Sequence, residues 1–331
     1  MEYSKALLFF PNNSIALYNR GVYKLELNEL EPAILDFKKS LIYDFPEPIY
    51  PLRNIGSCFS ELGNLDSALV YYDQSLEIDP KFSSVLKDKG LTLYKLGKLD
   101  QALENFNLAL KIEPKYAEAL AGRGQVYQDL GKIKKAEKDY SMAISLDKTS
   151  YDSFNNRGNI KKELGNFEGA IMDYERAIEL YPEYYLTYFN LGVIFGEAKN
   201  YDKAIWYYSK SIDLNPYDES SYLNRGVARA QAPTKDYFGS ILDFSKAIEL
   251  NPEKALHHNN RGFTRMNLGD FELAIEDFNK AISLDPSYGM AYKNRARAKV
   301  KLNRIADGCE DYKIAIKLVE KISEKELTVC N

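Results

Sequence analysis

The stretch ALAGRGQVYQDLGKIKKAEKDYSMAISLD, residues 119–147, contains two segments of helical apolar spacing joined by a short turn. Its small residues Gly124 and Ala136 stand twelve positions apart, and the aromatic Tyr140 follows four positions later. Apolar residues that recur three and four positions apart predict one buried face on each helix. Gly131 between the segments suits the left-handed residue that ends many helices. The stretch therefore predicts an antiparallel helical hairpin.

The same hairpin recurs along almost all of the 331 residues. The small residue returns every 34 to 36 positions, at Gly21, Gly56, Gly90, Gly124, Gly158, Gly192, Gly226, Gly262 and Ala296. The aromatic place is filled by Phe37, Tyr72, Phe106, Tyr140, Tyr174, Tyr208, Phe244, Phe278 and Tyr312. One hairpin cannot cover its own apolar face, so neighbouring hairpins must stack. We predict nine repeats over residues 14–322, starting near 14, 49, 83, 117, 151, 185, 219, 255 and 289, and a C-terminal tail over 323–331.

These small and aromatic places, with closing prolines such as Pro80, Pro114 and Pro286, resemble the tetratricopeptide repeat. The resemblance implies an all-α fold, a right-handed solenoid of antiparallel helix pairs that forms an α-α superhelix. It also implies a concave groove lined by the first helix of each repeat. Two departures predict longer connections, one near Pro46 between repeats and one around Pro233 within repeat seven. Such an array serves many processes, so the resemblance identifies an architecture rather than an activity.

Residues 1–13 resemble the second helix of a further, truncated repeat, with Tyr3, Ala6 and Pro11 at the aromatic, small and closing places. The first helix of that repeat would lie before Met1. The outer face of this orphan helix lacks its usual cover. Two interpretations stay open: the chain begins inside a longer array, or the helix caps the array and joins copies of the chain into a homo-oligomer.

Composition excludes several classes of partner. The net charge of −4, from 44 basic and 48 acidic residues, gives no electrostatic footprint for nucleic acid. No apolar run approaches the roughly 18 residues of a membrane helix, so membrane insertion is not expected. A nucleophile elbow, a phosphate loop and an isolated carboxylate pair are all lacking, so we expect no enzyme and no cofactor. His257 and His258 have no third ligand near them in the sequence, so no metal site is expected.

The three cysteines, Cys58, Cys309 and Cys330, form no metal-binding or redox motif. We expect Cys58 and Cys309 to be small core residues and Cys330 to lie in a loose tail. Sparse, unpaired cysteines favour a reducing compartment, and no secretory signal is visible. The sequence therefore favours a cytoplasmic protein.

One charge pairing recurs within repeats. Six repeats carry arginine directly before the small residue, at Arg20, Arg123, Arg157, Arg225, Arg261 and Arg295. Each arginine has an aspartate 16 positions later, or 18 in repeat seven, at Asp36, Asp139, Asp173, Asp243, Asp277 and Asp311. The repeats that lack the arginine have Tyr71, Asn105 and Tyr207 instead of the aspartate. We therefore predict a structural Arg–Asp bridge between the two helices of each such repeat.

A row of asparagines predicts a peptide-binding groove. By the resemblance, the sixth place of the first helix faces the groove, and it is Asn19, Asn54, Asn156, Asn190, Asn224, Asn260 and Asn294. A primary amide donates to a carbonyl and accepts from an N–H, so such a row could hold an extended main chain. Asp88 and Gly122 interrupt the row, which places the peptide on repeats five to nine. The alternative is that these amides only satisfy local backbone groups.

The first helix of repeat nine carries Lys293, Arg297 and Lys301 at four-residue spacing. They predict a site for an acidic peptide segment, with a solvated end face as the alternative. No three successive repeats supply the lysine, asparagine and arginine places with which this family clamps a terminal carboxylate. Phe189 and Leu223 are apolar at places that face the groove, so they suit a partner's side chains or close packing.

These features together predict a non-catalytic scaffold that binds an extended peptide or protein segment in its groove. Two alternatives remain: a structural protein that self-assembles through its N-terminal helix, and a substrate-recruiting fragment of a larger enzyme.

Overall fold

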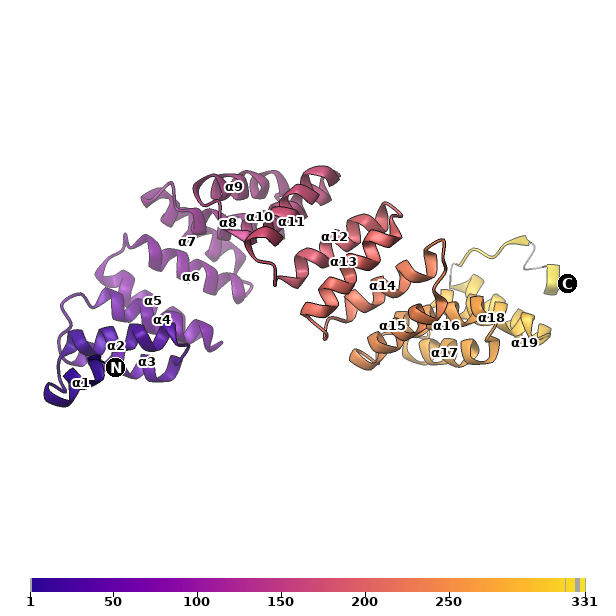
Figure 1. The fold of residues 1–331 in the computed structure, drawn as a ribbon, viewed down its shortest axis with the longest axis horizontal. Helices are drawn as coiled ribbons and strands as arrows, with labels where there is room; N and C mark the ends of the chain where they lie inside the picture. The colour runs from indigo at the N-terminus through magenta and orange to yellow at the C-terminus, as the bar shows by residue number, and fades with distance from the viewer. Residues whose placement is uncertain (1, 319, 325–327, 331) are drawn as a thin grey trace. The chain divides into compact units, whose positions relative to one another are not determined.

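The computed structural model describes residues 2–318, 320–324 and 328–330 (Figure 1). These residues form helices and turns and contain no strand. They divide into two compact parts, residues 1–173 and 174–331, which we call the N-terminal half and the C-terminal half. The boundary falls inside one helix, α11 (Phe167–Leu180).

The N-terminal half contains α1 (Glu2–Phe9), α2 (Ser14–Glu26), α3 (Leu30–Ile42), α4 (Ile49–Glu61), α5 (Leu65–Ile78), α6 (Ser83–Lys95), α7 (Leu99–Ile112), α8 (Ala117–Asp129), α9 (Ile133–Leu146) and α10 (Tyr151–Glu163). The C-terminal half contains α12 (Tyr185–Glu197), α13 (Tyr201–Leu214), α14 (Glu219–Gln231), α15 (Tyr237–Leu250), α16 (Ala255–Leu268), α17 (Phe271–Leu284), α18 (Gly289–Lys301), α19 (Ile305–Lys317) and the 3₁₀ turn η1 (Thr328–Cys330).

Successive helices pack as antiparallel pairs within each half, as the sequence predicted. The pairs are α2–α3, α4–α5, α6–α7 and α8–α9 in the N-terminal half, and α12–α13, α14–α15, α16–α17 and α18–α19 in the C-terminal half. First helices of neighbouring repeats also contact each other, for example α14 with α16 and α16 with α18. The first helices therefore form one continuous face in each half.

Small residues let an aromatic ring reach the backbone of the neighbouring helix. A Cβ atom added to Gly56 would lie 2.6 Å from the ring of Tyr72, whose side chain is buried. Real Cβ atoms do not approach so closely, so glycine is required at this contact. Ala68, on the same helix as Tyr72, is fully buried. The contact between the small residue and the aromatic ring thus joins the two helices of a repeat.

The turns inside the repeats have the predicted left-handed residue. Gly63 has a φ of 77°, a conformation that costs glycine little. Where repeats lack this glycine, the non-glycine residues Asn28, Lys199, Lys235 and Asn303 take positive φ instead. Pro233 lies in the exposed turn between α14 and α15, which confirms the longer connection expected there.

The N-terminal helix α1 packs against α2 and buries Leu7. The next three side chains remain outside this contact, because Leu8 is 80% exposed, Phe9 79% and Phe10 68%. Three consecutive apolar side chains at the end of α1 are therefore exposed.

The cysteines differ from expectation at two of three positions. Cys58 is buried and free, as predicted, and burial raises the pKa of its thiol to about 12. The expectation that Cys309 is a core residue and Cys330 a loose end is wrong, because the two form a disulfide. Their Cα atoms lie 5.7 Å apart, since the chain after α19 returns to place η1 beside that helix. A separation of 21 residues carries no sequence signal for such a return.

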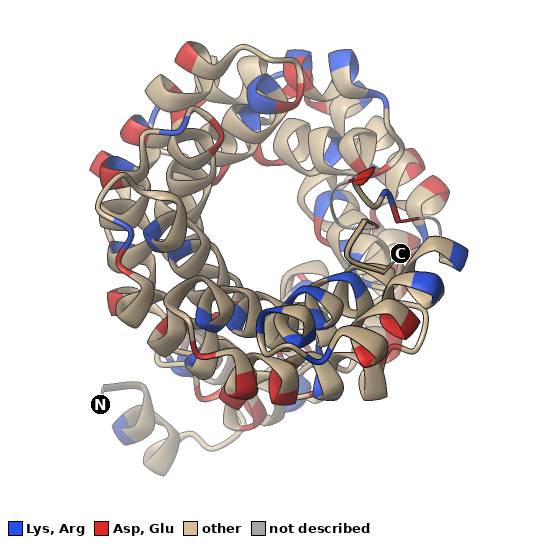
Figure 2. Ribbon diagram, turned by 90° about the vertical axis from the view of Figure 1, so that its right-hand side faces the viewer, with Lys and Arg blue, Asp and Glu red and all other residues tan. Residues whose placement is uncertain are grey.

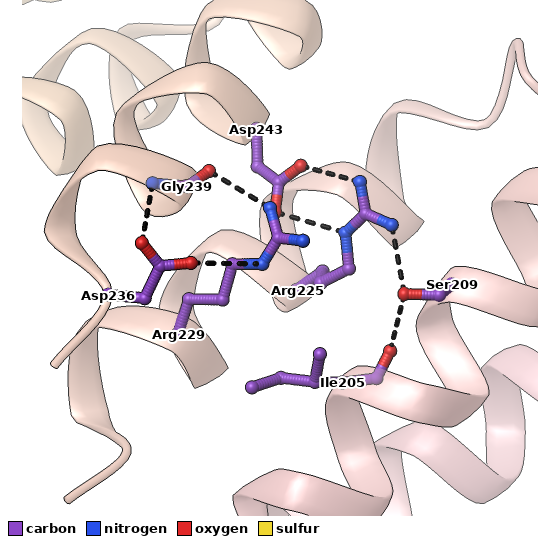
Figure 3. Close-up of polar contacts among 7 residues, drawn as sticks. All are labelled: Ile205, Ser209, Arg225, Arg229, Asp236, Gly239 and Asp243. Carbon is purple, nitrogen blue, oxygen red and sulfur yellow. Dashed lines mark hydrogen bonds and ion pairs between the residues drawn. The ribbon is translucent and has the colours of Figure 1, made fainter. Parts of the chain in front are cut away.

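All six predicted Arg–Asp bridges are present, each between the two helices of one repeat. In the close-up of Figure 3, Arg225 donates from Nη2 to Asp243 Oδ1 at 2.7 Å and from Nε to Oδ2 at 3.0 Å. Arg225 Nη1 also donates to Ser209 Oγ at 2.9 Å, on the second helix of the preceding repeat. Arg229 adds a second cation, with Nη1 2.9 Å from Asp243 Oδ2. Arg225 on α14 thus links its own helix to α15, through Asp243, and to α13, through Ser209.

The same three-helix link recurs at other arginines. The contacts of Nη1 with the preceding repeat run from Arg123 to Asn107, from Arg157 to Ser141, from Arg261 to Ser245 and from Arg295 to Asn279. The bridges therefore stabilise the stacking of neighbouring repeats as well as each hairpin. In repeat one, burial raises the pKa of Asp36, but hydrogen bonds from Arg20 and Lys24 outweigh it and hold the pKa below its ordinary value.

The buried His257 predicts acid sensitivity in the C-terminal half. Its side chain on α16 is 2% exposed, and its Nδ1 atom has no hydrogen-bond partner among the residues that the structure describes. Burial lowers the pKa of His257, against the opposing charge of Glu219. The unfolded chain, with an ordinary histidine pKa of about 6.5, then binds the proton first. The free energy of unfolding should fall as the pH drops below about 6.5, by at most about 1.4 kcal/mol per pH unit.

Urea unfolding at pH 7.5 and pH 5, followed by circular dichroism, measures this effect. The His257→Gln variant is the control, because it keeps a polar side chain but does not titrate. The loss of stability on acidification should be smaller in the variant than in the parent chain. Equal losses in both would contradict the assignment to His257.

Candidate functional site

Three cavities follow one another along the first helices of the C-terminal half. The first, of about 240 Å³, lies between α12 and α14 and includes Val193 and Asn224 in its lining. The second, of about 290 Å³, lies between α14 and α16 and includes Asn260 and Phe263. The third, of about 610 Å³, lies between α16 and α18 and reaches the 3₁₀ turn η1.

Neighbouring cavities share lining residues. Val227 and Gln231 line both the first and the second cavity, and Asn267 lines both the second and the third. Because each shared side chain borders two cavities, the three adjoin as one row, which we call the cavity row. An extended segment lying on this face could therefore contact all four first helices from α12 to α18.

The cavity row contains two of the predicted asparagines. Asn224 lines the first cavity, and its Nδ2 donates to the backbone oxygen of Ser220 at 2.9 Å. Asn260 lines the second cavity, and its Oδ1 lies 3.4 Å from Nδ2 of Asn259. Both amides are half-buried. Each amide therefore uses part of its hydrogen-bonding capacity locally and lies where a bound main chain could reach it.

The other predicted asparagines of the C-terminal half lie differently. Asn294 is 2% exposed, donates to Asn259 Oδ1 at 3.1 Å, and lies with its own oxygen 3.4 Å from Arg297 Nη1. Its amide therefore serves contacts within the protein. Asn190 is half-buried on α12 and is not among the residues that line the cavity row.

Three predicted asparagines belong to the N-terminal half. Asn54 donates to the Tyr18 hydroxyl at 3.4 Å, and Asn156 Oδ1 lies 3.5 Å from Asn155 Nδ2. Asn19 is half-buried on α2.

An ion cluster lies where Asp88 interrupts the asparagine row. The carboxylate of Asp88 lies 2.7 Å from Arg53 Nε and 2.6 Å from Lys87 Nζ. Lys87 Nζ also lies 3.1 Å from the carboxylate of Glu118. Burial lowers the pKa values of Arg53 and Lys87, but the charge of Asp88 outweighs it and raises both. At this position of the row, acidic and basic side chains that pair with one another stand in place of an amide.

The predicted basic residues all lie on α18, and two of them line the third cavity. Arg297 and Lys301 line the third cavity, together with apolar side chains that include Met266 and Val300. Lys293 instead donates from Nζ to the backbone oxygen of Lys321 at 2.5 Å. The cations therefore divide between the cavity row and the chain that follows α19.

The predicted apolar residues Phe189 and Leu223 are half-buried and do not line the cavity row. Phe189 packs against Tyr208, with ring centroids 5.9 Å apart, so its role includes repeat packing. Sequence reasoning missed the polar residues Glu197, Gln231 and Asn267, which stand at the thirteenth place of successive first helices. The sequence signal that could have found them is a polar residue at the same place of three successive first helices.

Other classes of site receive no support from the described part of the chain. No group of three His, Cys, Asp or Glu residues there could hold a metal ion. Among the same residues, no helix has the length and apolar character needed to cross a membrane. Basic and acidic residues are interspersed along the helices, as Figure 2 shows by colour.

Comparison with known sequences identifies the family. Models described as tetratricopeptide repeat match residues 50–82, 117–150, 151–184, 255–288 and 173–205, and one described as TPR repeat matches residues 90–131. Together they cover more than half of the chain. The chain belongs to the tetratricopeptide repeat family. Members of this family are in general non-catalytic scaffolds for protein interactions, with protein or peptide partners. A search of curated proteins found no significant match.

Solved structures agree on the fold. The Pseudomonas aeruginosa pilF protein is 22% identical with a TM-score of 0.59, over 65% of this chain and 97% of that one. A tetratricopeptide repeat protein from Parabacteroides merdae is 21% identical with a TM-score of 0.52, over 76% and 98%. YrrB, a tetratricopeptide repeat protein with an unusual peptide-binding site, is 21% identical with a TM-score of 0.50, over 57% and 96%. At these identities the likeness concerns the fold alone.

Proposed function

We propose that the chain is a non-catalytic scaffold that binds an extended peptide or protein segment along the cavity row. The observation that carries this proposal is the adjoining arrangement of the three cavities on one face of four successive first helices. An extended ligand presents side chains at regular intervals, so it can fill separate cavities while its main chain runs between them. The peptide-binding site of the similar protein YrrB is in keeping with this reading.

Asn224 and Asn260 are the amides proposed to hold the ligand's main chain. Each lines a cavity and is half-buried, so a ligand bond would be shielded from water. A single hydrogen bond contributes only about 1 kcal/mol net, so the cavities must supply the rest of the affinity. Arg297 and Lys301, at the end of the row, favour a ligand with an acidic segment there.

Replacing both asparagines with alanine should weaken peptide binding by roughly 10- to 30-fold, from two lost bonds of about 1 kcal/mol each. Displayed random peptides of twelve residues would be selected on the parent chain, and the best binders measured by fluorescence anisotropy. Asn19→Ala with Asn54→Ala is the matched control, because these residues hold the same repeat place in repeats one and two, outside repeats five to nine. Unchanged affinity in Asn224→Ala/Asn260→Ala would discard the amide mechanism.

Self-assembly is a second candidate function, favoured by the exposure of Leu8, Phe9 and Phe10 on and beside α1. Three adjoining apolar side chains in water favour association with another apolar surface. Light scattering over a concentration series distinguishes the two functions, because the scaffold proposal requires no growth in mass. A strict monomer at high concentration would remove the self-assembly candidate.

A further inference from the structure

The third cavity differs from the other two in size, composition and construction. Its volume of about 610 Å³ falls within the range of roughly 300–1,000 Å³ typical of ligand pockets, whereas the first and second cavities fall below it. Its walls include the apolar side chains of Met266, Phe271 and Val300. Arg297 and Lys301 are the charged members of its lining.

One wall comes from the segment that follows α19. Val329 in η1 lines the cavity, and its neighbour Cys330 is joined to Cys309 on α19. The cavity keeps its volume with Val329 in place, so this residue is a wall and not an occupant. The disulfide is the covalent link that holds the wall at α19.

The segment also contacts the start of α18. Lys321 accepts a hydrogen bond from Lys293 through its backbone oxygen. A Cβ added to Gly289 would lie 2.7 Å from the side chain of Glu320, so the chain passes very close to this helix. Two separate regions, Glu320–Lys321 and η1, thus lie against the last repeat.

We propose that the third cavity is a disulfide-completed pocket for a bulky apolar side chain that stands next to a carboxylate in the bound peptide. This inference rests on the proposed function, because it names the part of the ligand that reaches the end of the cavity row. The apolar walls receive the side chain, and Arg297 and Lys301 pair with the adjacent acidic residue. The continuity with the second cavity through Asn267 favours a peptide over a separate small molecule.

The charge requirement is tested by selecting displayed twelve-residue random peptides on the full chain and on Arg297→Glu/Lys301→Glu. Peptides from the parent chain should be enriched in Leu, Met or Phe beside Asp or Glu. The reversed variant should lose this pairing at least tenfold and select the same apolar residues beside Lys or Arg. Lys280→Glu/Lys313→Glu is the matched control, since both lysines are exposed on second helices and change the net charge equally.

The role of the disulfide is tested with Cys330→Ser in the same selection. Loss of the tether should reduce the enrichment of the apolar–acidic pair by at least tenfold, while dependence on Asn224 and Asn260 persists. Equal or stronger enrichment of the apolar–acidic pair in Cys330→Ser would contradict the proposal that the disulfide-held Val329 completes the pocket. Enrichment of acidic residues without an apolar neighbour would contradict the proposed pocket. Enrichment of the apolar–acidic pair that persists in Arg297→Glu/Lys301→Glu would contradict it as well.

The two proposals fail in different ways. Peptides that bind through Asn224 and Asn260 but lack the apolar–acidic pair leave the proposed function standing and remove this inference. If no displayed peptide binds the parent chain, both proposals are contradicted.

Discussion

Phe278→Ala is expected to destabilise the contact between α16 and α17 by about 3–5 kcal/mol, the usual cost of removing a buried aromatic side chain. The ring is fully buried and lies 2.9 Å from the point that a Cβ on Gly262 would occupy. It belongs to a cluster with Ala274 and Ala298, so it also joins repeat eight to repeat nine. Alanine would leave a cavity that two rigid helices cannot fully close.

Amide hydrogen exchange read by mass spectrometry measures this effect, because it reports the opening free energy of α16 and α17 separately from the rest of the array. Phe238→Ala is a matched control, since this phenylalanine is 71% exposed on α15. The control should change local stability by no more than about 0.5 kcal/mol. Similar losses in the two variants would contradict the packing role of Phe278.

Asp277→Ala should cost about 3 kcal/mol of local stability. The carboxylate is 4% exposed and lies 2.7 Å from Arg261 Nη2 and 2.8 Å from Arg265 Nη1. Removing it leaves two partly buried guanidinium groups without their counter-charge, and such a loss exceeds the net value of the pair itself. Arg261 would also lose the partner that fixes it for its bond to Ser245 on α15.

The matched control is Asp73→Ala. Asp73 is 53% exposed and pairs with Lys89, so its loss should cost no more than about 1 kcal/mol. Hydrogen exchange in α5 and α6 for the control, and in α15 to α17 for Asp277→Ala, gives the comparison. If Asp277→Ala lowers local stability no more than Asp73→Ala does, the buried bridges stabilise the protein no more than exposed ion pairs do. Protection lost in α15 as well as in α16 and α17 is the expected sign of the three-helix link.

The repeat architecture was predictable because its determinants are local. Gly56 and Tyr72, like Arg261 and Asp277, stand 16 positions apart within one hairpin. Two helices joined by a tight turn bring such residues together whatever the rest of the chain does. The left-handed glycine at Gly63 depends only on its own turn. Sequence spacing therefore predicted the hairpins and their charge pairs.

The candidate site was predictable only in part. Asn224 and Asn294 hold the same repeat place, yet Asn224 lines a cavity and Asn294 is buried against Asn259. The place in the repeat fixes the direction of a side chain, whereas neighbouring repeats decide what surrounds it. The second role of the arginines, toward Ser209 and its equivalents, also depends on the repeat before.

The sequence by itself determined the period, the helix pairs and the bridges inside them, because each rests on residues of one hairpin. Only the tertiary structure decided which amides border cavities, how those cavities adjoin, and that Cys309 meets Cys330. The physical reason is the sequence separation of the residues involved. A cavity is the space left between side chains from several repeats, and the disulfide depends on the path that the chain takes after α19. Neither is encoded in the spacing of a single repeat.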